Sequence, residues 1–392
     1  MSPVPPADVV IIGGGVIGAS TAFQLGRRTA GRVILVERDT VGSGPTAKTI
    51  GIIRLHYSYE PLVRLAVRGL EMFSHFEALT GATADFTRMG FLLLATPDQL
   101  HAVEENVGIQ QRLGVRTSIL SPAEIARLDA RLHLDDVGGA AYEPDSGYAD
   151  GYATTAGFAS AARRLGVEIW EGTRAERLVV DGGTVRAVVT SRGMIETPRV
   201  LVASGAWTPA LMATAGVTVP IQASRQQVVH LEPPRSFGRL DVEIEDMTQG
   251  FYARPESRST VLAGVLEEEA EEIVSVDGYN QGVDFDFVSR VGQLWAHRYP
   301  GASEAAVRGG YASIYDITPD WQPVLGAVDG VQGLFIAAGF SGHGFKLSPA
   351  LGEALAALLT GQRPEIDIST FVLSRFAEGR LIRGKHAQGI LG

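Results

Sequence analysis

Two glycine-rich turns in this chain combine residue types that bind negative charge. The first is Gly13-Gly-Gly-Val-Ile-Gly18, and the second is AGFSGHGFKLSPA, residues 338–350, which places a lysine among glycines ahead of an apolar helical pattern. Glycine lets the backbone approach a ligand, and a helix start attracts an anion. The glycines of the second turn have part of the Walker spacing, but Phe345 separates the last one from Lys346, so a phosphate loop is disfavoured.

The first turn lies inside a β-α-β pattern. Residues 8–12 form a β-branched run, residues 19–28 have helical spacing, and residues 33–36 form a second apolar strand that ends in Glu37. A G-x-G-x-x-G turn between such elements, with an acid about 20 residues further on, is typical of dinucleotide binding. The sequence therefore predicts a dinucleotide site at the end of the first strand.

Each residue of this motif has an expected role. Gly13 should permit the turn, Gly15 should let the pyrophosphate approach, and Gly18 should let the helix pack closely on the strand. Glu37 should accept hydrogen bonds from the adenosine ribose and would repel a 2′-phosphate. NADP is therefore disfavoured, which leaves FAD or NAD.

Composition excludes several classes of function. The 392 residues are 45% hydrophobic and 20% charged, carry a net charge of −10 and include no cysteine. The acidic balance argues against nucleic acid, and the lack of cysteine excludes disulfides, thiolate catalysis and metal–thiolate sites. The first residues lack a signal-peptide pattern and no apolar run is long enough for a membrane span, so we expect a cytoplasmic protein without a membrane partner.

The rest of the chain alternates helical and strand patterns. We predict helices over residues 63–81, 151–165 and 283–298, and a short helix over 125–132 after the capping box Ser121–Glu124. We predict strands over residues 88–97, 167–170 and 199–203, a hairpin with its turn at 181–183, and several antiparallel strands within 225–266. The last block, from residue 333, reads as strand, glycine turn and helix.

With these segments in order, the chain resembles flavoenzymes of the D-amino-acid-oxidase superfamily. It is most similar to the branch of monomeric sarcosine oxidase, dimethylglycine dehydrogenase and the mammalian FAD-dependent oxidoreductase-domain proteins. The segments that carry the resemblance are IIGGGVIGAS with LVER, GPTAKTIGIIRLHYS, MGFLLLATP, YEPDSGYAD, VLVASGAW, GGYASIYDITPDWQPVLG and AAGFSGHGFKLSPALGE.

The resemblance implies an α/β fold. A Rossmann-type FAD-binding domain is expected over residues 1–86, 141–222 and 317–392, interleaved with an α+β substrate domain over residues 87–140 and 223–316. The substrate domain is expected to be built on a mostly antiparallel sheet. FAD would lie with its isoalloxazine ring at the junction of the two domains.

Cofactor-binding residues carry over by matching segment. Those of the adenosine diphosphate half are Gly13, Gly15, Gly18, Glu37, Arg38 and Ala175. Those along the ribityl chain and flavin are Ser43, Ala47, Lys48, Thr49, Ser204, Gly205 and Trp207, and the turn at the pyrimidine edge is Gly342, His343, Gly344, Phe345 and Lys346. His343 is expected to position the backbone rather than carry a proton.

The resemblance also implies substrate contacts. Arg54 and Lys346 match the two cationic positions that hold a substrate carboxylate, since a planar fork and a point charge together fix both oxygens. Tyr252 and Tyr315 match two aromatic positions that flank the substrate. The helix start expected at Ser348-Pro349 would stabilise the reduced flavin.

Four positions depart from the sarcosine oxidase pattern. Leu266 replaces a histidine, Leu262 a lysine linked to oxygen activation, and Gly51 an arginine. Ser313 replaces the cysteine that tethers flavin, so FAD is expected to be noncovalent. The missing cation weakens the case for a dedicated oxidase, although Arg254 could enter the site, and the pocket should be larger and more apolar.

We therefore expect an FAD-dependent amine or amino-acid oxidoreductase that acts by hydride transfer to flavin N5 and gives an imine. Two alternatives stay open: a 2-hydroxy-acid dehydrogenase or biosynthetic tailoring oxidase on the same scaffold, and a non-catalytic FAD-stabilised assembly protein. The small-molecule substrate, the choice of oxidase or dehydrogenase, and a monomeric, homo-oligomeric or hetero-oligomeric state are not decided by the sequence.

Overall fold

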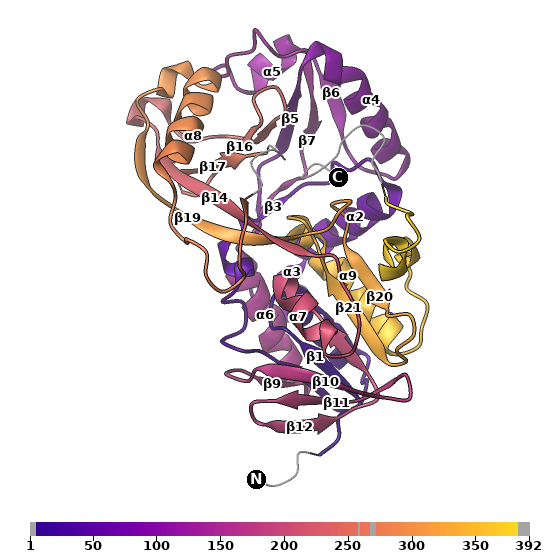
Figure 1. Cartoon of the computed structure of the whole chain (residues 1–392). Coiled ribbons are helices and arrows are strands. Elements are labelled where there is room, and N and C mark those ends of the chain that lie inside the picture. The colour runs from indigo at the N-terminus through magenta and orange to yellow at the C-terminus, as the bar shows by residue number, and fades with distance from the viewer. Residues whose placement is uncertain (1–4, 258, 267–271, 383–392) are drawn as a thin grey trace.

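A computed structural model describes residues 5–257, 259–266 and 272–382 (Figure 1). A six-stranded sheet forms one half, in the order β20-β21-β13-β1-β2-β9, and all neighbours are parallel except β20 and β21. Its strands are β1 (Val9–Ile12), β2 (Val33–Val36), β9 (Glu168–Trp170), β13 (Val200–Val202), β20 (Val324–Ala327) and β21 (Leu334–Ala338).

This parallel sheet is covered on both faces, which explains why β1 and β2 are apolar at every position. Alternate residues such as Val9 and Ile11 pack with α1 (Val16–Arg27), α6 (Gly151–Arg164) and α9 (Gly344–Leu359). Their neighbours Val10 and Ile12 face α7 (Thr208–Ala213) and a three-stranded sheet. That sheet contains β10 (Ala175–Asp181), β11 (Thr184–Thr190) and β12 (Gly193–Glu196), and it includes the predicted hairpin.

A second large sheet forms the other half, in the order β18-β14-β17-β16-β15-β5-β7-β6, with β19 paired to β14. Its strands are β5 (Phe91–Ala95), β6 (Ser118–Leu120), β7 (Gly139–Glu143), β14 (Gln222–Glu232), β15 (Glu243–Asp246), β16 (Phe251–Pro255), β17 (Val261–Val265), β18 (Glu272–Ile273) and β19 (Ala306–Ile317). In Figure 1 the long strands β14 and β19 run from this sheet toward the parallel one.

The antiparallel prediction for this second sheet is right with one exception. Every pair is antiparallel except β15 and β5, which run parallel. A small sheet of β3 (Ile52–Ile53), β8 (Gly147–Tyr148) and β4 (Thr87–Arg88) completes the strands. The predicted α/β fold is thus confirmed, while the division into domains stays a proposal.

Two helix predictions need correction. The helix predicted over 63–81 is two helices, α2 (Glu60–Ser74) and α3 (Phe76–Thr80), since His75 leaves helical geometry. The short helix α5 (Pro122–Leu128) begins and ends earlier than the predicted 125–132. The helix predicted over 283–298 is confirmed as α8 (Phe285–Arg298). Within the described ranges no helix is long and apolar enough to cross a membrane.

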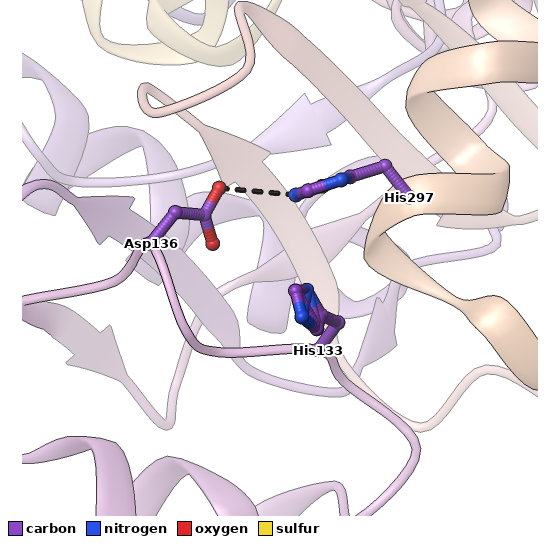
Figure 2. A group of neighbouring side chains, drawn as sticks. All are labelled: His133, Asp136 and His297. Carbon is purple, nitrogen blue, oxygen red and sulfur yellow. Dashed lines mark hydrogen bonds and ion pairs between the residues drawn. The ribbon is translucent and has the colours of Figure 1, made fainter.

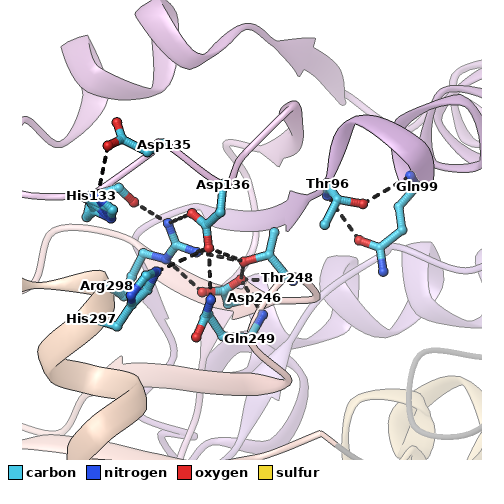
Figure 3. Close-up of polar contacts among 10 residues, drawn as sticks. All are labelled: Thr96, Gln99, His133, Asp135, Asp136, Asp246, Thr248, Gln249, His297 and Arg298. Atoms are coloured by element: carbon cyan, nitrogen blue, oxygen red, sulfur yellow. Dashed lines mark hydrogen bonds and ion pairs between the residues drawn. The ribbon is translucent and has the colours of Figure 1, made fainter.

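Helix α4 (Pro97–Arg112) was not predicted. It begins with a capping box in which Thr96 Oγ1 accepts from the Gln99 amide N–H and the Gln99 side chain accepts from the Thr96 N–H (Figure 3). Thr-Pro-x-Gln is a readable helix start, so the signal was present in the sequence.

Candidate functional site

The turn after β1 is built around glycines, and Gly13 and Gly18 have no room for a side chain. Gly13 has φ +110°, and a β-carbon there would lie 2.3 Å from the Ala203 carbonyl oxygen. A β-carbon on Gly18 would lie 1.9 Å from the Gly13 carbonyl oxygen, so close packing of α1 on the turn requires glycine. A β-carbon on Gly15 would lie 3.3 Å from its nearest neighbour, Thr46 Oγ1, so the space in front of the helix start is more open than at the other two glycines.

The first turn of α1 fits a cofactor diphosphate. The N-cap residue of α1 is Gly15, which has no side chain to cap the helix, and no acidic residue lies in the first turn. The protein therefore does not neutralise the positive end of the helix dipole, which can bind an anion. The Glu37 carboxylate accepts hydrogen bonds from the Gly14 N–H at 2.6 Å and the Asp39 N–H at 2.8 Å. These bonds hold Glu37 at the end of β2, beside the turn.

Other predicted cofactor residues gather near this turn. Ser204 and Gly205 follow the neighbouring strand β13, and Gly205 begins a short 3-10 helix that ends at Trp207. The Arg38 guanidinium lies over the Trp207 ring at 4.9 Å. Ser43 lies in the loop after β2, and Ala47 lies in the 3-10 helix Pro45–Lys48, which Thr49 follows as its C-cap residue. Ala175 is the first residue of β10. Lys48 donates to Gln281 Oε1 at 2.7 Å, which joins this loop to the segment before α8.

The second glycine turn starts α9 earlier than predicted. The helix begins at Gly344, not at Ser348-Pro349, and places Phe345 and Lys346 in its first turn. Pro349 fits inside the helix because Ser348 Oγ donates to the Phe345 carbonyl at 2.8 Å, the oxygen that the missing proline N–H would have bonded. Gly342, with φ +89°, lies against the Tyr315 ring, where a β-carbon would be 2.6 Å from the ring.

A cavity lies where this turn meets the loop around β3 and the strands β15, β16 and β19. It brings together all four residues predicted to contact substrate, together with Thr49, Gly342 and Phe345 from the cofactor set. Its lining residues are Thr49, Ile50, Ile52, Arg54, Glu245, Tyr252, Leu266, Tyr315, Gly342, Phe345 and Lys346. His343 is buried beside it, and its Nδ1 is 3.2 Å from the Tyr57 hydroxyl.

The guanidinium of Arg54 is buried, with 1% of the residue exposed, and it has protein partners. Its Nε donates to Glu245 Oε1 at 3.1 Å, and its Nη1 donates to the His56 carbonyl oxygen. The guanidinium carbon also lies 4.8 Å from the Tyr57 ring centre. Arg54 is therefore engaged with a carboxylate of the protein itself, which the sequence analysis did not foresee.

Lys346 differs from Arg54 in this respect. The described residues supply no hydrogen-bond partner to its ammonium group, which lies 6.0 Å from the Tyr57 ring centre. Burial lowers the pKa of Lys346 from 10.5 to about 7, and the nearby Arg54 charge acts in the same direction. Glu245 and Glu243 oppose this shift in pKa.

Three buried glutamates were missed by the sequence analysis. Glu243 and Glu245 alternate with apolar residues along β15, so both point to the same face of the sheet. Glu143 Oε2, from β7, accepts from the Leu55 N–H at 2.8 Å and the Ser146 hydroxyl at 2.7 Å. Burial raises the pKa of Glu143 to about 7 and the pKa of Glu243 well above its usual value. The alternation in DVEIED was the available signal.

The structure places three of the residues that depart from the sarcosine oxidase pattern and gives a reason for one of them, Gly51. A β-carbon at Gly51 would lie 2.0 Å from the Ala149 carbonyl oxygen, so no arginine fits there. Leu266 lines the cavity, while Leu262 is buried in β17 opposite Arg254. The Arg254 guanidinium donates to the carbonyl oxygen of Ile50, donates to the Pro255 carbonyl at 2.7 Å and pairs with Glu256 at 2.6 Å. It therefore contacts the cavity wall through Ile50 but is not itself a lining residue.

A second polar cluster lies away from this cavity. Figure 2 shows His133, Asp136 and His297, whose potential ligand atoms lie within 4.8 Å of one another. Figure 3 shows that Asp136 also pairs with Arg298 at 2.9 and 3.0 Å and accepts from Gln249 Nε2 at 2.8 Å. Because the carboxylate already faces a buried guanidinium, we interpret the cluster as a structural tie between α8 and the loop before β7.

The glycine turn, Glu37 held at the end of β2 and the cavity fit an oxidoreductase that binds a dinucleotide cofactor. Residues 8–358 match the family described as FAD dependent oxidoreductase (DAO). The chain belongs to this family, FAD is its cofactor, and the predicted resemblance is confirmed.

Individual relatives are distant. The chain is 29% identical over 387 residues to 4-methylaminobutanoate oxidase (formaldehyde-forming) of Paenarthrobacter nicotinovorans, covering 94% of this chain and 45% of that one. It is 27% identical over 387 residues to mitochondrial sarcosine dehydrogenase of Mus musculus, covering 95% and 42%. The chain thus spans less than half the length of these two relatives. The crystal structure of L-proline dehydrogenase from P. horikoshii matches with a TM-score of 0.89 and 26% identity, covering 97% of this chain and 100% of that one.

Proposed function

We propose that this protein oxidises the C–N bond of a carboxylate-bearing secondary amine, an N-methyl or cyclic amino acid, to the imine. The observation that carries the proposal is the buried ammonium group of Lys346, which faces a cavity shared with Arg54, Tyr252 and Tyr315. A buried cation without a hydrogen-bonding partner is unfavourable unless a ligand supplies one. A substrate carboxylate is such a ligand.

The names of the relatives support the same chemistry. The substrates named for the three proteins compared above are 4-methylaminobutanoate, sarcosine and L-proline. Each of these compounds carries a secondary amine and a carboxylate. Which compound of this class the present protein takes is the question for experiment.

The residues of this chain would bind, orient and shield the substrate. When bound, FAD supplies the acceptor for the hydride that leaves the carbon beside the nitrogen. Lys346 holds the carboxylate while it is protonated, and Tyr252 and Tyr315 confine the substrate and exclude water. The first N–H groups of α9 have no partner within the helix, so this end of the helix favours negative charge at the reduced cofactor.

Two observations weigh against the alternatives. None of the described residues that line the cavity is a histidine, the side chain that would have favoured oxidation of a 2-hydroxy acid. The Lys346 ammonium group in the cavity wall also favours an enzyme over an assembly protein.

The test is anaerobic reduction of the flavin in the purified holoenzyme. Sarcosine, 4-methylaminobutanoate and L-proline are compared with glycolate and L-lactate, and bleaching is followed near the flavin absorbance maximum. We expect at least one secondary amine to reduce the flavin and the hydroxy acids to leave it oxidised. Bleaching by the hydroxy acids alone would overturn the proposal, as would a purified protein that carries no flavin and cannot be reconstituted.

A further inference from the structure

Glu245 lines the cavity, and its carboxylate has one oxygen engaged by Arg54 and one without a hydrogen-bond donor. Oε1 accepts from Arg54 Nε at 3.1 Å, while Oε2 is buried and accepts no hydrogen bond from the described residues. Both residues line the cavity, and only 6% of Glu245 is exposed. Buried carboxylate oxygens are normally satisfied by donors, so a ligand that enters this cavity should bring one.

The position of Glu245 suits a substrate that also reaches Lys346. Glu245 is the cross-strand neighbour of Tyr252, and its charge is felt by both Lys346 and Tyr315. The carboxylate therefore lies among the groups expected to surround the substrate. The negative charge of Glu245 would repel a substrate carboxylate rather than bind it.

The two cations of the site are consequently unequal. Arg54 already has a carboxylate partner in Glu245, and a second carboxylate beside it would be repelled by that partner. Lys346 has no hydrogen-bonding partner among the described residues. An amino acid satisfies both ends of the cavity when its carboxylate binds Lys346 and its amine N–H donates to Glu245.

We propose that Glu245 is the specificity residue that accepts the substrate's amine N–H on Oε2, and that Arg54 is a positioning residue that orients Glu245. The inference rests on the proposed function and extends it. The substrate class becomes amino acids whose amine keeps an N–H for Glu245 in the neutral form that can lose a hydride, with the carboxylate assigned to Lys346 alone. The proposal changes the role of Arg54, because the family resemblance implied that Arg54 binds the substrate carboxylate.

The experiment compares a ligand that has the N–H with one that lacks it. For L-proline the oxygen isostere is tetrahydro-2-furoate, and for sarcosine the sulfur isostere is methylthioacetate. Both keep the carboxylate and the approximate shape. Dissociation constants of the isosteres are measured by calorimetry on the oxidised holoenzyme, and those of the amino acids from the concentration dependence of anaerobic flavin reduction.

We expect Glu245→Gln to weaken the amino acid by about 10- to 100-fold, the range for a hydrogen bond to a charged group, and to leave the isostere unchanged or tighter. Lys346→Met should weaken both ligands. Glu256→Gln is the matched control, because Glu256 is half-exposed and pairs with Arg254 outside the cavity; it should change neither ligand. Equal weakening of amino acid and isostere by Glu245→Gln would overturn the proposal, as would no weakening of either.

A second variant covers the case in which Glu245→Gln fails to retain FAD. Glu245→Asp keeps the negative charge beside Arg54 but withdraws the oxygen from the cavity, so it should weaken the amino acid and spare the isostere. If the wild-type flavin is reduced by none of the secondary amines, the proposed function fails. If it is reduced but the variants do not discriminate between the paired ligands, only the role of Glu245 fails.

The pH dependence separates the two ends of the substrate. The groups whose charge interacts with Glu245 are Arg54, Tyr57, Glu143, Glu243, Tyr252, Tyr315 and Lys346. The isostere shares the response of the carboxylate end, so its affinity should fall as pH rises and Lys346 loses its proton. The ratio of the two affinities then reports the amine end, and it should favour the amino acid more in the wild type than in Glu245→Gln at every pH.

Discussion

Replacing Lys346 by methionine should make the folded holoenzyme more stable at neutral pH, although it removes the proposed carboxylate anchor. Burial lowers the pKa of Lys346 from 10.5 to about 7. The unfolded chain therefore binds a proton at pH 7–10 that the folded chain releases, and the lysine disfavours folding. Methionine has a similar shape and no charge, so it removes this penalty.

The magnitude follows from the same shift. At about 1.4 kcal/mol for each pH unit between the two pKa values, the full penalty is about 4–5 kcal/mol. We expect a measured gain of about 2–4 kcal/mol at pH 7, since relaxation around a buried charge reduces its cost. The penalty is fully present below pH 7 and is lost as pH rises toward 10.5. Wild type and variant should therefore converge in stability between pH 7 and pH 10.

The assay is urea unfolding of both proteins at pH 7, 8, 9 and 10, with the same excess of FAD so that cofactor binding contributes equally. Circular dichroism and flavin release report unfolding. Arg64→Met is the control, because Arg64 is an exposed helical residue paired with Glu60 and should change stability by only about 0.5 kcal/mol. A Lys346→Met protein less stable than wild type at pH 7, or a difference that does not depend on pH, would refute the reasoning.

Two further predictions concern the buried ion pair of Arg298 and the glycines of the first turn. Arg298→Met should lower the free energy of unfolding by about 3–5 kcal/mol, because it leaves the buried Asp246, now paired at 2.7 Å, without its cation; urea titration measures this, and a loss below 1 kcal/mol contradicts it. Gly18→Ala should destabilise even the FAD-free protein by about 1–3 kcal/mol through overpacking, whereas Gly15→Ala should change that stability little and weaken FAD binding in a fluorescence titration. Equal effects of the two substitutions on the FAD-free protein would contradict the roles assigned to these glycines.

The β-α-β unit was predictable because its determinants are local. The β-branched run, the glycines, the helix and Glu37 lie within one short stretch, and contacts such as the β1–β2 pairing and the hydrogen bond from the Gly14 N–H to Glu37 form within it. The same holds for the hairpin of β10 and β11 and for the capped start of α5. Sequence patterns of this kind determine the fold class and, through the family resemblance, the cofactor.

The start of α9 needed the structure. A proline after serine suggested a helix start at Ser348, and only the hydrogen bond from Ser348 Oγ to the Phe345 carbonyl explains why the helix tolerates Pro349. This shift of one turn places Lys346 inside the first turn of the helix and in the cavity wall.

The sequence by itself determined that β15 alternates acidic and apolar residues, and therefore that its glutamates share one face. Alternation of this kind ordinarily indicates an exposed face, and the apolar residues Val242 and Ile244 do pack in the core of the second sheet. Only the tertiary structure decided that the acidic face is buried, because it places Glu245 against Arg54, 191 residues away in the chain. Burial and charge pairing depend on such long-range packing, which no local pattern encodes.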